Sequence, residues 1–450
     1  MINIQNKQLC ARLDALNLDA WARKCRVDTG YTKKIRGRDL LQGFLLMHAQ
    51  QGASLEDWAG CIEGFSGRPV SKQALFQRCT EKHVRFFERV CTEALQQRVG
   101  PEADAVGPAL RSFRHVFVED STCIGLDRSL SEAFPSSYTK GADAATARLQ
   151  LRVDLQQERI TDFHIGSYRD NDQSYSRNIL TEAGPGDLVI RDMGYFSLPT
   201  FQALADQGSF FLSRLRYGVV LSDRETGRRI ELLEKGGLLT TGDPTRDTID
   251  LKVQIGAKTP VPVRLIGRRV PEEVAAERRR KAKSDRHGRA NHGAEYLRWL
   301  DWNFFVTNVG LKRWTAETAS AVYRLRWRIE VVFKTLKSCF RAATQLEKRR
   351  MSACRVRLTI LGWLIYSALV LEPTYRYFAA QLSPRGKALS LLKYGRWLRI
   401  HYVEMLLEES LASFTDRVAR HCVYEVRHDR SSYNDHRSSV GKQQTTPTFP

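Results

Sequence analysis

Three carboxylates in this sequence have surroundings that suit metal-dependent chemistry. Asp120 follows the apolar run HVFVE (115–119) and Asp192 follows LVIR (188–191), so we expect each aspartate where a strand gives way to a loop. Glu330 lies in a segment with helical spacing. Carboxylates on two strands and a helix can converge on two divalent cations, which catalyse in-line displacement at phosphorus. The ions expected are Mg²⁺ or Mn²⁺, because both prefer oxygen ligands.

Glu330 shares its predicted helix, 316–340, with three other polar side chains. At about 100° per residue, Tyr323, Arg326 and Lys337 fall with Glu330 in a stripe roughly 60° wide. A solvated charged face is the ordinary explanation for such a stripe. Basic side chains beside a carboxylate cluster would also offset its repulsion, and this favours a site over a plain surface.

The same four residues match a known pattern. The spacing Y-x2-R-x3-E-x6-K resembles the Y-R-E-K signature of bacterial insertion-sequence transposases, a group within the DDE transposases of the ribonuclease H-like superfamily. The blocks VEDST (118–122) and DMGYF (192–196), around the two aspartates, are similar to that family as well. The resemblance covers about residues 106–345.

This resemblance implies an α/β fold, a ribonuclease H-like catalytic core interrupted by a β-rich insertion. It implies catalytic and metal-binding roles for Asp120, Asp192 and Glu330, and DNA-backbone contacts for Tyr323, Arg326 and Lys337. The implied reaction is cleavage at the terminal inverted repeats of an insertion sequence and joining of the 3′ hydroxyls to target DNA. The implied partner is double-stranded DNA, with a homodimer forming on the DNA ends. A ribonuclease H-like nuclease and a non-catalytic DNA-binding relative remain alternatives.

Two tryptophans lie close to the signature. Trp302 resembles the tryptophan that stacks on a flipped base in some members of the family, but it also begins an apolar strand, so a core role stays open. Trp327 lies beside the stripe, where it would either pack under DNA or support the helix.

The first 105 residues are predicted to be helical and to bind DNA. Ser54 and Ser71 are suited to cap two helices, 55–65 and 72–90, joined by a short turn that contains glycine. That outline fits a helix-turn-helix whose second helix offers Lys72 and Arg78 to DNA. Plain helical packing is the alternative.

Changes in hydrophobic period divide the rest of the chain. Short β-rich runs begin near residue 106, a second β-rich stretch follows 222, and helical spacing returns after 316. The predicted parts are a helical domain (1–105), the core's first part (106–221), the insertion (222–300), the core's second part (301–372), a helical region (373–426) and a disordered tail (427–450).

Composition agrees with a polyanionic partner. Lys and Arg number 71 against 50 Asp and Glu, a formal charge of +21. The nine cysteines form no CxxC pair, so we expect neither a zinc ribbon nor a disulfide framework, and free thiols suit a reducing bacterial cytoplasm, near the nucleoid. We expect no secretory signal and no membrane partner, since the run 358–371 is shorter than the roughly 20 residues that span a bilayer.

Overall fold

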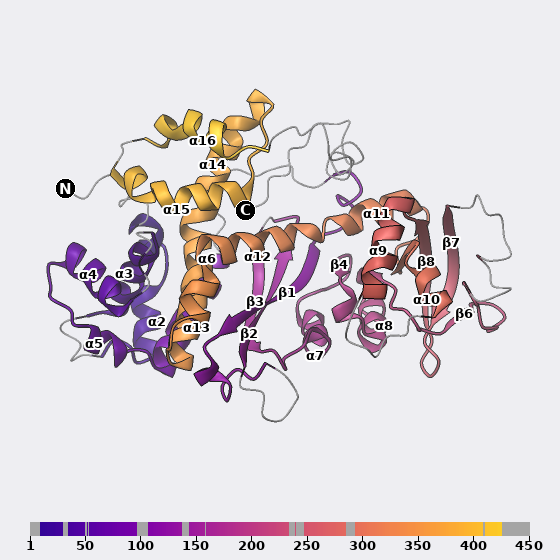
Figure 1. The fold of residues 1–450 in the computed structure, drawn as a ribbon, viewed down its shortest axis with the longest axis horizontal. Helices are drawn as coiled ribbons and strands as arrows, with labels where there is room; N and C mark the ends of the chain where they lie inside the picture. Colours follow the sequence, from indigo (N-terminus) through magenta and orange to yellow (C-terminus); the bar gives the residue numbers. More distant parts are fainter. Residues whose placement is uncertain are drawn as a thin grey trace.

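A nine-stranded mixed sheet runs through the computed structural model of this protein (Figure 1). The structure describes residues 10–29, 35–49, 52, 54–96, 107–136, 144–157, 159–233, 239, 247–284, 293–407 and 410–424. The strands are β1 (Val116–Leu126), β2 (Ala145–Asp154), β3 (Arg159–Ser167), β4 (Leu188–Arg191), β5 (Phe210–Arg214), β6 (Leu221–Asp223), β7 (Thr248–Ile255), β8 (Val261–Arg269) and β9 (Trp302–Thr307). Their order across the sheet is β3-β2-β1-β4-β5-β9-β8-β7-β6. The predicted α/β class is confirmed.

Strand β1 lies between two kinds of neighbour. It pairs antiparallel with β2, which pairs antiparallel with β3. On its other side it pairs parallel with β4, and β4 pairs parallel with β5. Parallel neighbours place their carboxyl ends at one edge of the sheet, so the chain leaving β4 emerges beside β1.

The stretch 222–300 adds strands to this same sheet. β9 pairs antiparallel with β5 and with β8, and β7 and β6 follow on the outside. Helices α9 (Glu272–Ser284) and α10 (Ala294–Trp299) lie between β8 and β9 in the chain. Within the β-rich stretch predicted after 222, residues 228–233 form no strand, and an isolated bridge joins Ser222 to Arg229. The basic segment 277–290 is helical to residue 284 and then leaves the described residues.

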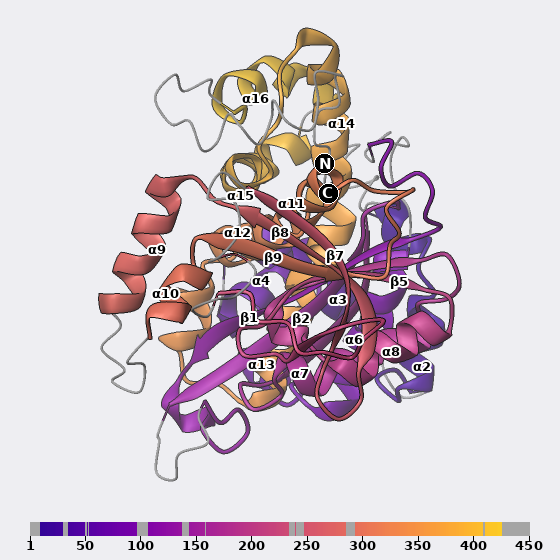
Figure 2. The same cartoon turned by 90° about the vertical axis from the view of Figure 1, so that its right-hand side faces the viewer.

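Helices cover both faces of the sheet (Figure 2). On one face, Phe117 and Val189 pack with Phe201 of α8 (Leu198–Asp206). The short helix α7 (Asp172–Tyr175) and the 3-10 turns η2 (Ser176–Thr181) and η3 (Met193–Tyr195) lie between β3 and α8 in the chain. On the other face, Val118 and Ile190 pack with helices that follow β9. This alternation follows from the two-residue period of a strand.

The predicted helix 316–340 is two helices, α11 (Ala316–Arg324) and α12 (Trp327–Cys339). At the junction, the amide of Leu325 donates to the carbonyl of Val322 and that of Arg326 to Tyr323, three residues back. A 3-10 turn advances further around the axis per residue than an α-turn does. Glu330 nevertheless stays within hydrogen-bond reach of Arg326 across this junction.

The N-terminal part is helical where it is described, as predicted. Its helices are α2 (Leu18–Lys24), α3 (Gly37–Ala49), α4 (Leu55–Ser66), α5 (Lys72–Phe76) and α6 (Glu81–Gln96). Ser54 and Ser71 cap α4 and α5 through their hydroxyl oxygens, as expected. The single helix predicted for 72–90 is wrong: α5 ends after five residues, and a new helix starts after Thr80, whose hydroxyl contacts the His83 ring at 2.9 Å.

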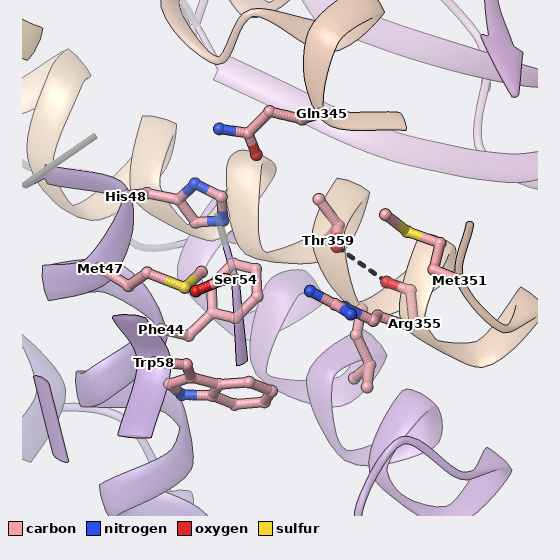
Figure 3. Close-up of a pocket in the computed structure, with 10 residues that line it drawn as sticks. Phe44, Met47, His48, Ser54, Trp58, Gln345, Met351, Arg355 and Thr359 are labelled. Carbon is pink, nitrogen blue, oxygen red and sulfur yellow. Dashed lines mark hydrogen bonds between the residues drawn. The ribbon is translucent and has the colours of Figure 1, made fainter. Parts of the chain in front are cut away.

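A long helical stretch that follows β9 in the chain packs against the N-terminal helices. It comprises α13 (Ala353–Tyr366), a π-helical turn η5 (Ser367–Leu371) and α14 (Glu372–Leu382), followed by α15 (Leu391–Leu407) and α16 (Thr415–His421). By length and composition 353–385 could cross a membrane, but 78% of its apolar window is buried inside the protein, as in a core helix. α13 packs on α3, and a small pocket between them is lined by Phe44, His48 and Thr359 (Figure 3). The predicted tail, 427–450, lies outside the described residues.

Candidate active site

Asp120 lies inside strand β1 and not at its end, which corrects the sequence-based expectation. The parallel pairing with β4 stops at Glu119 opposite Arg191. The antiparallel pairing with β2 continues, with Asp120 opposite Leu151 and the ladder running on to Leu126. The reason is that β2 is long enough to keep β1 paired after β4 has ended. Asp120 is thus held in a strand that is still paired with β2 but no longer paired with β4.

Asp192 lies where it was predicted, immediately after β4. Its carboxylate accepts a hydrogen bond from the hydroxyl of Tyr323 on α11, with Oδ1 and the hydroxyl oxygen 3.2 Å apart. Tyr323 is buried, and its ring lies 5.0 Å from that of Phe305 on β9. Burial, and next the charge of Asp192, raise the pKa of Tyr323. The tyrosine is therefore a neutral donor that fixes one oxygen of Asp192.

Arg326 brings the three carboxylates together. Its Nη1 lies 2.8 Å from Asp120 Oδ2, its Nη2 lies 2.6 Å from Glu330 Oε1, and its Nε lies 3.8 Å from Asp192 Oδ1. Asp120 and Arg326 are 206 residues apart in the sequence. The structure thus assembles Asp120, Asp192, Glu330, Tyr323 and Arg326 around one positive charge. Arg326 itself lies at the α11–α12 junction.

The cluster has the electrostatics of a cation site. Burial raises the pKa of Asp120 to about 6, although Arg326 and the amide of Ser121 act to lower it. Burial also acts to lower the pKa of Arg326, but the neighbouring carboxylates and Tyr323 outweigh burial and raise it. A desolvated carboxylate group of this kind requires a positive partner. Arg326 supplies that charge here.

Metal ions fit the chemistry of these donors but not the present side-chain arrangement. All three candidate ligands are carboxylates, the hard oxygen donors that Mg²⁺ and Mn²⁺ prefer. Within the part of the chain that the structure describes, no three His, Cys, Asp or Glu side chains already surround a metal position. The three carboxylates face the guanidinium of Arg326 instead, so a metal ion would have to share or replace that contact.

A buried ion network lies behind the cluster, on the opposite face of the sheet. Glu119 faces away from Asp120, as strand alternation predicts, and its two oxygens contact Arg152 (3.0 Å) and Arg191 (2.6 Å). All three side chains are almost fully buried. Because Glu119 and Arg191 adjoin Asp120 and Asp192 in the chain, this network fixes β1 against β4 next to the two aspartates.

Asp172 is a further carboxylate, on the Glu119 side of β1, and the sequence pattern does not mark it as a site residue. It lies at the start of α7, accepts a hydrogen bond from the hydroxyl of Ser121 (2.6 Å) and pairs with Arg148 (3.0 Å). A Cβ on Gly194 would lie 2.6 Å from its Oδ2. Asp172 therefore touches the segments that follow both aspartates. No motif marks it, since the contact depends on how α7 folds back over the sheet.

The other predicted DNA-binding residues lie outside the cluster. Lys337 is half-buried on α12, and burial lowers its pKa. Lys334, one turn nearer, is the lysine that contacts Glu330, at 4.0 Å. In the N-terminal helices, Lys72 is exposed and pairs with Glu56 (2.9 Å), while Arg78 is half-buried and donates to the carbonyl of Ala74 (2.8 Å).

The two tryptophans have opposite environments. Trp302 is 4% exposed, stacks on Phe304 and lies under the guanidinium of Arg269, so it has the core role that the sequence left open. In this arrangement its face is not available to a flipped base. Trp327, directly after Arg326, is 41% exposed beside the cluster.

Comparisons with known proteins identify similar sequences. The family model described as the transposase DDE domain matches residues 111–365, a span that contains Asp120, Asp192 and Glu330. The transposase for insertion sequence element IS231F of Bacillus thuringiensis subsp. israelensis is 26% identical over 351 residues, 74% of this chain and 72% of that protein. The transposase for IS1151 of Clostridium perfringens is 24% identical over 361 residues, 75% of this chain and 74% of that protein.

A solved structure is also similar. The piggyBac transposase synaptic complex with hairpin DNA superposes with a TM-score of 0.40 at 8% identity, covering 92% of this chain and 84% of that one.

Proposed function

This chain belongs to the transposase DDE domain family, and from that membership we propose that it is the transposase of an insertion sequence that binds the element's terminal inverted repeats, cleaves the DNA there and joins the 3′ hydroxyls to target DNA. The observation that carries this proposal is that three carboxylates meet around the guanidinium group of Arg326. Asp120 comes from β1, Asp192 from the end of β4 and Glu330 from α12. Residues so distant in the chain meet here with the charge complementarity that a phosphoryl-transfer site needs.

The sheet topology supports a ribonuclease H-like core. In the order β3-β2-β1-β4-β5 the first three strands are antiparallel, and β4 and β5 run parallel to β1. On this assignment the core comprises 106–221 and 301–372, and 222–300 is an insertion that widens the sheet. The N-terminal helices, with Lys72 and Arg78, would bind the element end.

DDE transposases use divalent metal ions, and in this chain Asp120, Asp192 and Glu330 would hold them. Two such ions, Mg²⁺ or Mn²⁺, activate the attacking oxygen and stabilise the leaving oxygen. The chain's own residues prepare the site. Tyr323 fixes one oxygen of Asp192, and Arg326 neutralises the carboxylates until DNA and ions arrive. Arg326, Tyr323 and Lys337 would then bind backbone phosphates.

The assembly and location follow from the same proposal. Joining two element ends requires both to be held together, so a homodimer would form on double-stranded DNA. The charge of +21 supports binding to that polyanion. The protein would act in the bacterial cytoplasm, on the nucleoid.

Conservative variants of the carboxylates test the reaction. Glu330→Gln and Asp192→Asn should each lower strand transfer at least about 10³-fold, corresponding to roughly 4 kcal/mol of lost transition-state stabilisation. Binding to a duplex that carries the terminal inverted repeat should persist, because the fold and the basic surface are unchanged. Asp206→Asn is the matched control, since Asp206 is an exposed acid on α8, away from the cluster.

The products separate the alternatives. Cleaved ends without joining to a supercoiled target would identify a ribonuclease H-like nuclease. Specific binding without any nicking would identify a non-catalytic relative. If Glu330→Gln retained full strand-transfer activity, the catalytic role proposed for Glu330 would be wrong.

A further inference from the structure

Two arginines meet on one amide oxygen in the part of the sheet next to Tyr323. Asn303 Oδ1 accepts hydrogen bonds from Arg214 Nη2 (3.1 Å) and from Arg278 Nη2 (3.0 Å). Arg214 ends β5, Asn303 lies on β9 and Arg278 lies on α9. Because both nitrogens bond to the same atom, the two guanidinium groups are close neighbours.

Nothing described in this structure neutralises these two charges. Among the described residues neither Arg214 nor Arg278 forms an ion pair with a carboxylate. The second nitrogen of Arg278 donates instead to the backbone carbonyls of Leu300 (3.2 Å) and Trp302 (3.5 Å). Burial lowers the pKa of Arg278, and the charge of Arg214 lowers it further.

The next residue on α9 makes the contrast clear. Arg279 is paired with Asp301 and with Glu272, so its charge is offset within the protein. Arg214 and Arg278 are held together against their mutual repulsion. An anion that bound both guanidinium groups would remove that repulsion and gain charge-assisted hydrogen bonds.

The pair lies beside the catalytic cluster. Arg214 is paired in register with Phe305, whose ring contacts Tyr323, and the charge of Arg214 acts to lower the pKa of Tyr323. On the other side, Asn303 is directly opposite Arg268 of β8, which places a third guanidinium on the same face of the sheet. Basic side chains therefore continue from the Asp192 side of the cluster across β5, β9 and β8.

We propose that Arg214, Asn303 and Arg278 form a phosphate-binding site that holds the DNA backbone on the Tyr323 side of the catalytic carboxylates. The proposal rests on the function proposed above and adds a contact that the Y-R-E-K residues do not supply. A planar guanidinium group can donate two parallel N–H hydrogen bonds to the oxygens of a phosphodiester. Two guanidinium groups can bind the same phosphate. Asn303 holds both in place before the DNA arrives.

Salt-dependent binding tests this site. Wild type, Arg214→Gln and Arg278→Gln are titrated onto a labelled duplex that carries the terminal inverted repeat, and anisotropy is recorded over a range of salt concentrations. Each variant should bind about tenfold more weakly at moderate salt, with the slope of log K against log [salt] reduced by about one. Arg280→Gln is the matched control: it lies on the same helix, is exposed and removes the same charge, and should change affinity less than about twofold.

The same measurements distinguish a phosphate site from a structural role. Arg278→Lys should keep the salt slope of wild type but lose part of the affinity, because a lysine retains the charge without the planar fork. The proposal is wrong if Arg214→Gln and Arg278→Gln lower thermal stability while affinity and slope match wild type. It is also wrong if Arg280→Gln weakens binding as much as they do. If wild type itself neither binds nor joins the ends, the function proposed above fails instead.

Discussion

Arg326 is the residue on which the acidic cluster depends in this structure. It contacts Asp120 and Glu330 directly and Asp192 at a longer distance. A guanidinium in that position does what a divalent cation would do, since it offsets the repulsion among three carboxylates. The two are therefore expected to compete for the same oxygens, and DNA phosphates offer Arg326 an alternative partner.

Removing Arg326 should show this competition directly. In metal-free buffer at neutral pH, Arg326→Ala should lower the free energy of unfolding by about 1–3 kcal/mol, because it leaves a largely buried carboxylate without its partner. Added Mg²⁺ or Mn²⁺ should then stabilise the variant more than it stabilises wild type. Urea denaturation with and without the metal measures both effects.

Lys334→Ala provides the comparison. Lys334 is exposed and lies 4.0 Å from Glu330, so its loss should change stability by no more than about 0.5 kcal/mol. Equal metal stabilisation of wild type and Arg326→Ala would contradict the competition, and so would an Arg326→Ala protein as stable as wild type without metal.

The elements position the cluster through pairing and close packing. β1 stays paired with β2 after its pairing with β4 has ended, and α12 packs against β1. Helix α13 ties this core to the N-terminal helices, where Gly362 faces the ring of Phe44 on α3. A Cβ on Gly362 would lie 1.9 Å from the Phe44 ring, too close for the two helices to keep their present separation.

Gly362→Ala tests that packing. Helix propensity alone predicts a gain of about 1 kcal/mol, whereas overpacking predicts a loss of about 1–3 kcal/mol or more. We expect the loss to dominate, and the free energy of unfolding in urea should fall. A second substitution, Phe44→Leu, should recover part of it.

Gly60→Ala is the matched control for the propensity effect. Gly60 lies within α4, and nothing lies within 4 Å of an added Cβ there. This substitution should be neutral or stabilising. If Gly362→Ala behaves in the same way, the contact between α3 and α13 is looser than the structure indicates.

At the scale of the whole molecule, the N-terminal helices and the core share one hydrophobic interior. Two buried histidines lie in that shared region. His48 contacts the rings of Phe340 and Trp363, and burial lowers its pKa to about 3. His83 has its pKa lowered to about 4, first by burial and then by nearby basic side chains.

Because these two histidines are buried in their neutral form, we expect the folded protein to lose stability in acid. An unfolded histidine binds a proton below about pH 6.5, whereas the folded protein resists protonation until about pH 3 to 4. Their contribution to stability is complete above pH 6.5 and is lost as the pH falls from 6.5 towards 4. The free energy of unfolding, measured from pH 8 to pH 4, should therefore decrease over that range.

A variant that cannot titrate isolates the effect. His48→Phe keeps an aromatic ring beside Phe340 and Trp363, so its stability at pH 8 should remain near that of wild type. Its loss of stability between pH 6.5 and 4 should be smaller, by up to a few kcal/mol for one buried histidine. An unchanged pH dependence would mean that His48 does not titrate on unfolding in this range.

The sequence alone was enough to predict the α/β class and most of the strands, and to single out the three carboxylates that meet around Arg326. Those features depend on local periodicity and on residue types at a fixed spacing, which are readable without the fold. Capping at Ser54 and Ser71 was predictable for the same reason.

Long-range contacts decided the rest. Asp120 lies inside a strand because β2 outlasts β4, and Asp172 reaches Ser121 because α7 folds over the sheet. Trp302 is buried beneath Arg269. Each of these outcomes depends on residues far apart in the chain, whose meeting is set by sheet pairing and helix packing and is not recorded in any local pattern.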